Sequence, residues 1–520
     1  MSSVVAGLIH YICNSVMKVY KIVLFVVGVV LALWMLSCLF PRQGIKIGQS
    51  VSLNFPSLDE VLAEEEEPEE EEVDSVVQVL SPEELMELRK AEQQAALDSE
   101  FVAFCRKSHT RIHMPDGDVT YLDPVFEALL NAKERPLRIM HYGDSQLEGD
   151  RITGVFREKI QETFGGNGTG LLPAVQTIGM ATARVETTPE LPHFMNFASS
   201  AFHADHKRYG PLAQVAVVDS AATFVVTAIG GSVYPHCRSF RRVSLAMKGQ
   251  GEIKVVAGDV EQTMTCALDT TFQGLRLFTT LLPRSVHKAT ITATGLMEVY
   301  ALMIDGANGV SVDNIAMRGV SGTFFTSLDR SSLAPFFTQQ NVGLILLQYG
   351  GNAMPYLKPG ESISNYKRQL KRQFELFKKM SPESRIIFIG PSDMATNVEN
   401  EMKTYPHLPM VVDSLRQAAL ESGVAFWDMY RAMGGRGSMV KWVTADPPLA
   451  GEDYIHFTPR GSRRMGEIFH GAFDFYYRYY RHRHHLDENE TLEDSLVRAD
   501  SLESNLKPLV VEKKTEEVTE

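Results

Sequence analysis

The chain has only five cysteines and three tryptophans in 520 residues. The irregular cysteine spacing offers no framework for a structural metal site. No stretch concentrates basic and aromatic residues, which argues against a nucleic-acid-binding surface. The net charge of −13 belongs to two acidic stretches, residues 59–74 at −11 and residues 487–520 at −7, so the rest of the chain carries about +5. The total charge therefore indicates no acidic or basic substrate.

Charged residues are also missing from residues 22–40, IVLFVVGVVLALWMLSCLF. A helix of this length crosses a hydrocarbon core of ~30 Å at ~1.5 Å per residue, so the run predicts a transmembrane anchor within residues 1–41. Basic residues flank the run on both sides and hardly select an orientation. Lipidation of Cys38 is an alternative, although the residues before it fit a cleavage site poorly. Residues 42–80 and 486–520 are acidic and predict a disordered linker and tail.

The remaining sequence alternates between strand and helix patterns. This alternation predicts a three-layer α/β domain with a parallel sheet, built from residues 81–183 and 306–485. The predicted strands are 137–142, 342–349, 385–390 and 424–428, and the main predicted helices are 82–105, 362–380, 408–422 and 460–480.

Residues 184–305 differ from this pattern, because short β-type runs there are separated by Gly, Asp, Asn and Pro. Regularly spaced strands of this kind predict an inserted β-sandwich. Cys237 and Cys266 both fall within it. They either pair in an oxidising compartment or remain two free thiols.

Three short polar segments stand beside predicted strand ends or before the last long helix. They are Gly143-Asp144-Ser145, Gly350-Gly351-Asn352 and Asp453-Tyr454-Ile455-His456. Open α/β sheets place their ligands at the carboxyl ends of the strands, so we expect the three segments to share one crevice. Asp453 can accept the Nδ1 proton of His456, which leaves Nε2 to act as a base on Ser145. A Gly-x-Ser-x-Gly elbow is absent around Ser145, which disfavours the α/β-hydrolase fold.

These segments resemble the SGNH (GDSL-type) hydrolase family, whose four blocks centre on Ser, Gly, Asn and His. The resemblance implies that Ser145 is the nucleophile, that His456 is the base and that Asp453 orients it. It also implies an oxyanion hole formed by the N–H groups of Ser145 and Gly322 and by the side chain of Asn352.

The glycine of the second block is less clearly marked than the other residues. Gly322 is the better match and Gly319 the second choice. The third block also departs from the family, because Ala353 follows Asn352 where an acid is common. This change affects the residues that support the asparagine and not the asparagine itself.

The stretch from Gly143 to Leu172 is similar to peptidoglycan O-acetylesterases. The likeness rests on Asp150 and Arg151 and on the glycine-rich run at residues 164–171. We expect Asp150, Arg151 and Gly351 at the rim of the site, with an ordinary helical ion pair as the alternative for the first two. Asp393, which follows the predicted strand 385–390, is expected beside the site but outside the triad.

The resemblance implies a serine esterase that removes O-acetyl groups from a cell-wall or surface glycan and needs neither cofactor nor metal, and the apolar run at residues 22–40 predicts that it is membrane-anchored. Its expected substrate is an acetylated polysaccharide or peptidoglycan. Two alternatives remain: an O-acetyltransferase working with a membrane protein that supplies acetyl groups, and a non-catalytic glycan-binding scaffold. The insert, jelly-roll-like by analogy, is expected either to bind carbohydrate or to act as a structural lid. The expected location is the bacterial inner membrane, with a single span and the catalytic domain in the periplasm.

Overall fold

The computed structural model describes residues 82–269 and 271–486, together with a few positions before residue 54. Most of the predicted membrane span, much of the acidic linker and the tail from residue 487 lie outside the described residues. Within the predicted linker, β1 (Ile45–Lys46) and β2 (Ser52–Leu53) form a short antiparallel pair. Among the residues that the structure describes, no helix is long and apolar enough to cross a membrane.

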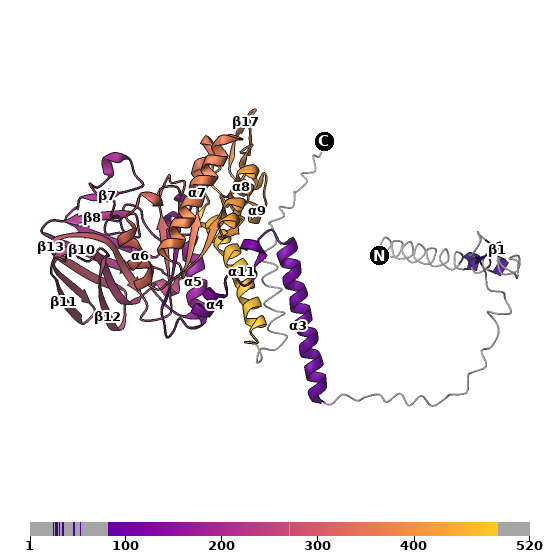
Figure 1. The fold of residues 1–520 in the computed structure, drawn as a ribbon, viewed down its shortest axis with the longest axis horizontal. Helices are drawn as coiled ribbons and strands as arrows, with labels where there is room; N and C mark the ends of the chain where they lie inside the picture. Colours follow the sequence, from indigo (N-terminus) through magenta and orange to yellow (C-terminus); the bar gives the residue numbers. More distant parts are fainter. Residues whose placement is uncertain are drawn as a thin grey trace, which may run out of the picture. The chain divides into compact units, whose positions relative to one another are not determined.

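A six-stranded sheet forms the centre of the α/β domain (Figure 1). Five strands are parallel, and the edge strand β3 runs antiparallel to β19. Strand β4 is buried along its whole length, as expected for a parallel strand covered on both faces. In spatial order the strands are β14 (Val310–Ala316), β4 (Leu137–Gly143), β15 (Val342–Gln348), β16 (Arg385–Ile389), β19 (Ala425–Trp427) and β3 (Ile112–His113).

Helices cover both faces of this sheet, so the predicted three-layer α/β fold is confirmed. Met140 of β4 packs into one core with α6, α7 and α8, whereas its neighbour Ile139 packs into a second core with α4, α5 and α11. This division follows from the alternating direction of side chains along a strand. The α-helices of the compact unit are α3 (Pro82–Lys107), α4 (Asp123–Leu130), α5 (Thr153–Phe164), α6 (Arg330–Gln339), α7 (Glu361–Met380), α8 (Leu408–Glu421), α9 (Met429–Ala432), α10 (Ser438–Val443) and α11 (Pro459–Arg483).

Short 3-10 helices and one hairpin complete this part of the fold. The hairpin pairs β17 (Ala395–Val398) with β18 (Glu401–Thr404). Helix α3 packs on α11 through aromatic stacking, with the rings of Phe101 and Tyr479 3.5 Å apart. The 3-10 helices of this part are η1 (Pro115–Gly117), η2 (Ser145–Asp150), η5 (Phe325–Ser327) and η6 (Gly351–Tyr356), and two more, η3 (Ser200–Phe202) and η4 (Pro235–Cys237), lie in the β-rich insert.

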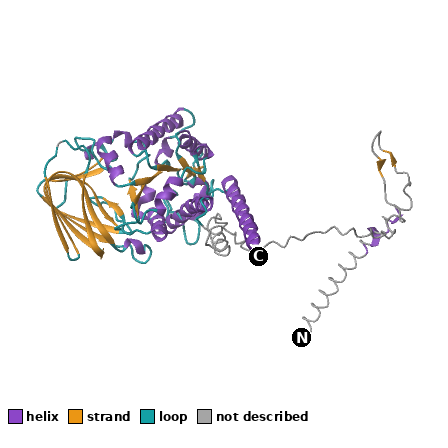
Figure 2. Cartoon of the chain, turned by 60° about the horizontal axis from the view of Figure 1, so that its bottom comes forward, coloured by secondary structure: helices purple, strands orange, loops and turns teal. Residues whose placement is uncertain are grey.

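The β-rich insert lies at one end of the compact unit, and the helix-covered sheet lies at the other (Figure 2). All nine strands belong to one hydrogen-bonded antiparallel network, so the two separate sheets of the predicted sandwich are not confirmed. Cys237 and Cys266 are both free thiols. The strands are β5 (Gly170–Leu172), β6 (Ala183–Thr188), β7 (His193–Met195), β8 (Gln214–Val218), β9 (Ala221–Ala228), β10 (Phe240–Ala257), β11 (Val260–Cys266), β12 (Arg276–Val286) and β13 (Lys288–Asp305).

The insert has its own apolar core. Alternate residues of β9 are buried, which places one face of that strand against this core. The long strands β10 and β13 meet at Gly251 and Gly295, whose φ values of +144° and +126° suit glycine. A Cβ on Gly251 would lie 2.0 Å from the carbonyl oxygen of Thr294, so glycine is required for the two strands to approach here.

Buried charges join the insert to the α/β domain. Arg138 of β4 lies 2.7 Å from Asp305, at the end of β13, and 2.6 Å from Asp313 of β14. Asp313 also accepts the backbone N–H of Leu171 in β5 at 2.8 Å. The strands that enter and leave the insert are therefore held together beside the strand that leads to Ser145.

Candidate functional site

The nucleophile turn follows the central strand β4. Ser145 begins η2, and the side chain of Asp144 caps this turn by accepting the backbone N–H of Gln146 at 3.0 Å. Such a cap satisfies an N–H group that the short helix leaves unpaired. The turn therefore presents Ser145 at the carboxyl edge of the parallel sheet, where the sequence predicts it.

Ser145, His456 and Asp453 form a continuous chain of hydrogen bonds. Ser145 Oγ lies 2.8 Å from His456 Nε2, and His456 Nδ1 lies 2.7 Å from Asp453 Oδ2. Asp453 Oδ1 also accepts the backbone N–H groups of Ile455 and His456, each at 3.0 Å. If Nδ1 donates its proton to Asp453, Nε2 is left as the acceptor for the serine hydroxyl. The structure thus brings the three residues together in the order needed to activate an alcohol.

Gln146 links the serine turn to the histidine loop, and the sequence reasoning did not identify it. Its side-chain Nε2 donates to the carbonyl of Ile455 at 2.6 Å, and its Oε1 accepts the N–H of Phe457 at 3.4 Å. These two backbone groups flank His456, and Gln146 is buried. One amide therefore holds both sides of the histidine, and only its position next to Ser145 could have signalled this contact.

Asn352 and the second-block loop face the same site. Asn352 lines the cavity, and its amide nitrogen donates to the carbonyl of Val320 at 3.2 Å. A side-chain amide has two N–H donors, so one remains for a ligand. Gly319 also lines the cavity, whereas Gly322 does not. A Cβ on Gly322 would lie 2.6 Å from the ring of Tyr349, so this glycine serves close packing, and Gly319 is the better candidate for the oxyanion site.

These residues open into a cavity of about 510 Å³. Its mouth includes Arg151 and Gly351, as the sequence predicts, and also Arg318, Glu148 and Tyr356, which it did not. Arg318 makes two hydrogen bonds to Glu148, both at 2.6 Å, which join the loop after β14 to the serine turn.

Two residues expected at the rim lie elsewhere. Asp150 and Asp393 are fully buried, and neither lines the cavity. Asp150, the last residue of η2, pairs with the buried Arg157 of α5 at 2.5 Å and not with Arg151, so this ion pair joins two elements. Asp393 accepts the backbone N–H of Met439 at 2.9 Å and supports the start of α10. Both carboxylates point into the protein, where buried donors bind both oxygens of Asp150 and one oxygen, Oδ2, of Asp393.

The two carboxyl groups next to the reacting atoms have opposite pKa shifts. Burial raises the pKa of Asp144 to about 6, against the opposing effects of the Gln146 N–H and of His456. At Asp453 burial also acts to raise the pKa, but hydrogen bonds from His456 and Ile455 outweigh it and lower the pKa. Asp453 therefore remains ionised at neutral pH and can stabilise a protonated His456.

Within residues 82–269 and 271–486, no group of three or more His, Cys, Asp or Glu side chains could hold a metal ion. The candidate site consists of hydrogen-bonding groups around the hydroxyl of Ser145.

Residues 292–464 match the GDSL-like lipase/acylhydrolase family. The chain carries a GDSL-like acylhydrolase domain. The domain identifies an enzyme of the esterase or acyltransferase class. The match contains Gly319, Asn352 and His456, while Ser145 lies before it, because the β-rich insert separates the first block from the others.

A solved structure with a similar fold is titled "Peptidoglycan O-acetylesterase in action, 5 min". It is 20% identical, with a TM-score of 0.56 over 72% of this chain and 99% of that one. A family two carbohydrate esterase from Cellvibrio japonicus is 10% identical, with a TM-score of 0.24 over 57% of this chain and 99% of the other. The first likeness supports the SGNH-type α/β fold, and no curated protein matches the sequence.

Proposed function

We propose that this protein is a serine esterase that removes O-acetyl groups from a cell-wall or surface glycan through an acyl-enzyme. One observation carries the proposal: the hydrogen-bonded chain from Ser145 through His456 to Asp453 opens into a cavity that Asn352 also lines. The GDSL-like domain supports ester chemistry.

In the first half of the reaction, His456 Nε2 takes the proton of Ser145 Oγ as this oxygen attacks the acetyl carbonyl carbon. The N–H groups of Ser145 and Gly319 and the free N–H of Asn352 stabilise the negative oxygen. The bond to the sugar oxygen then breaks, and that oxygen takes the proton from His456. In the second half, water gives a proton to His456, attacks the acyl-enzyme and releases acetate, and the proton returns to Ser145.

The mouth of the cavity favours a large, polar substrate. Tyr356 lines it and is 80% exposed, which leaves an aromatic face to pack against a sugar ring. Arg151 and Arg318 add hydrogen-bond donors beside it. The solved peptidoglycan O-acetylesterase of similar fold makes acetylated peptidoglycan the first substrate to test. We further propose that the apolar run at residues 22–40 anchors the enzyme in the bacterial inner membrane and that the catalytic domain works in the periplasm.

The test is acetate release from O-acetylated peptidoglycan by the purified protein and by its Ser145→Ala variant. We expect the wild type to release free acetate and the variant to lose about 10⁶-fold of this activity, because the nucleophile is gone. Tyr356→Ala should raise KM for the polymer and leave the rate on an aryl acetate unchanged. If Ser145→Ala keeps wild-type activity, the site assignment is wrong. If acetyl groups pass to a second glycan instead of water, the enzyme is a transferase.

A further inference from the structure

Helix α7 is strongly basic. It carries six basic and two acidic residues, a net charge of +4. Residues 82–486 as a whole sum to about +1, so α7 is far more basic than the folded chain on average. Helix α11 has the same net charge of +4.

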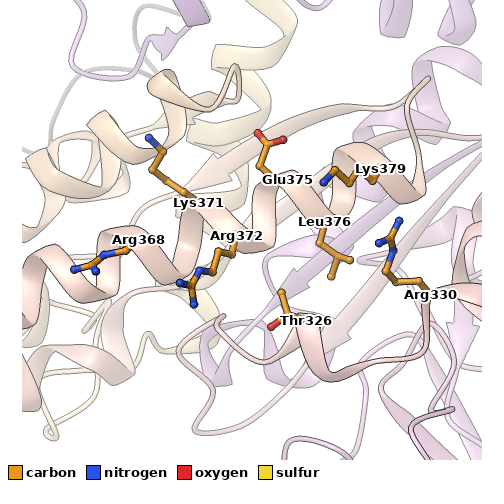
Figure 3. Close-up of a pocket in the computed structure, with 8 residues that line it drawn as sticks. All are labelled: Thr326, Arg330, Arg368, Lys371, Arg372, Glu375, Leu376 and Lys379. Atoms are coloured by element: carbon orange, nitrogen blue, oxygen red, sulfur yellow. The ribbon is translucent and has the colours of Figure 1, made fainter.

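These charges line a groove of about 450 Å³ on the protein surface (Figure 3). One side is α7, and the other contains η5 and the start of α6. Leu376, which is buried, forms an apolar part of the floor. Eight residues line the groove: Thr326, Arg330, Arg368, Lys371, Arg372, Glu375, Leu376 and Lys379.

Several of these side chains already have partners. Arg368 donates to the side chain of Asn365 at 2.6 Å, and Lys371 lies 3.2 Å from Glu421. Glu375, the one acid in the groove, lies 3.1 Å from Lys378, which does not line it. The negative charge within the groove is thus offset by a neighbouring lysine.

Three other cations in the groove keep their charge available. Arg330, Arg372 and Lys379 are exposed, and no ion pair joins any of them to an acid among the described residues. An anionic ligand would supply the partners that the protein does not.

The shape of the groove favours a chain-like ligand. Arg368 and Lys379 are eleven residues apart on α7, which at ~1.5 Å per residue spreads the cations over ~16 Å. Arg330 comes from the facing side, so the positive surface is concave (Figure 3). A flat bilayer would not reach all of these side chains. None of the eight lining residues is aromatic, and single-stranded nucleic acids bind mainly where bases stack on aromatic rings.

We propose that this groove binds a linear anionic polysaccharide whose repeating units carry carboxylate or phosphate groups. The arginine and lysine side chains of the groove pair with these anionic groups along the polysaccharide, and the apolar floor of the groove contacts the sugar rings. None of the groove residues belongs to the catalytic cavity, so this binding surface goes beyond the proposed esterase function. It would hold an anionic polymer independently of ester cleavage.

The test uses the full chain and measures binding to polygalacturonate and to a phosphate-bearing teichoic acid by titration calorimetry. Neutral dextran is the control polymer. We expect affinity for at least one anionic polymer that weakens as salt rises, because salt screens exposed charges. The triple variant Arg330→Gln/Arg372→Gln/Lys379→Gln should bind about tenfold more weakly, since three surface ion contacts are lost.

A matched variant removes three exposed cations outside the groove, Lys159→Gln/Arg184→Gln/Lys403→Gln. It has the same net charge as the groove variant and should keep near wild-type affinity. Both variants should retain full activity on an aryl acetate, which separates failure here from failure of the esterase proposal. Equal losses in the two variants, binding of dextran as tight as that of the anionic polymers, or no binding at low salt would each overturn the proposal.

Discussion

Two polar networks lie along the same sheet, and they differ in their access to water. The side chains of His456 and Asp453 are 42% and 48% exposed, so protons can be exchanged there. Arg138, Asp305 and Asp313 are at most 3% exposed. A sealed charge network is stable only while every charge keeps its partner, because desolvation is costly. The open network is therefore suited to chemistry, whereas the sealed one joins the insert to the α/β domain.

Breaking the sealed network should give the largest effect on stability. Arg138→Met would leave two buried carboxylates without a cation, and we expect it to lower the free energy of unfolding by about 3–5 kcal/mol. Denaturant unfolding measures this change. The matched control is Arg284→Met, since Arg284 pairs with Asp259 at the surface, where both side chains are more than 60% exposed. Similar losses in the two variants would contradict the proposed difference between sealed and exposed pairs.

Removing a donor from the open network should instead reduce the rate. Asn352→Ala is expected to lower kcat on an aryl acetate by about 10²–10³, because one oxyanion donor is lost while the fold remains. Steady-state kinetics and a melting curve check the two parts of this expectation. Asn131→Ala is the control, because this amide also donates to a backbone carbonyl but lies far from the cavity. A kcat within a few fold of wild type would remove Asn352 from the oxyanion site.

Gln146 tests whether the open network depends on a buried support. Gln146→Leu removes both contacts to the loop that carries His456, and we expect kcat to fall by about 10–10² with KM unchanged, because the base is no longer held in place. Kinetics of the double variant with His456→Ala provide the sharper measurement. If Gln146 acts through His456, the second substitution adds no further loss.

Gln161→Leu is the matched control for that experiment, since Gln161 is buried and donates to the carbonyl of Val310 at 3.0 Å. It should destabilise the protein without changing kcat. Fully additive effects of Gln146→Leu and His456→Ala would show that Gln146 only stabilises the fold.

The smallest expected effect concerns pH. Burial raises the pKa of Asp144 to about 6, so the folded state holds an extra proton between roughly pH 4 and pH 6. The stability that this bound proton contributes is fully present below the pKa of Asp144 in the unfolded chain. It is lost as pH rises through 6. The free energy of unfolding of Asp144→Asn should therefore rise relative to that of the wild type by on the order of 1–2 kcal/mol from pH 4 to pH 7. Unfolding curves at both pH values measure it, and a constant difference would contradict the raised pKa.

Much of the fold could be predicted because its signals are local. The apolar run of β4 indicates a buried parallel strand, and the alternating residues of β9 indicate a half-buried antiparallel one. Strands β6 to β13 fall almost entirely within residues 184–305, whereas β5, which pairs with β13, lies before that range. The sandwich was not predictable in the same way, because alternation shows which face of a strand is buried and not how the strands are joined.

The sequence by itself determined the order of the strands along the chain and the three polar segments, because hydrophobic period and turn residues act over a few positions. Tertiary structure alone decided that Gly319 faces the cavity, that Asp150 and Asp393 turn inward, and that Gln146 holds a loop 309 residues away. Side-chain direction at a turn depends on neighbours that only folding brings near. For the same reason, only the folded chain shows that α6 faces the cations of α7 across one groove.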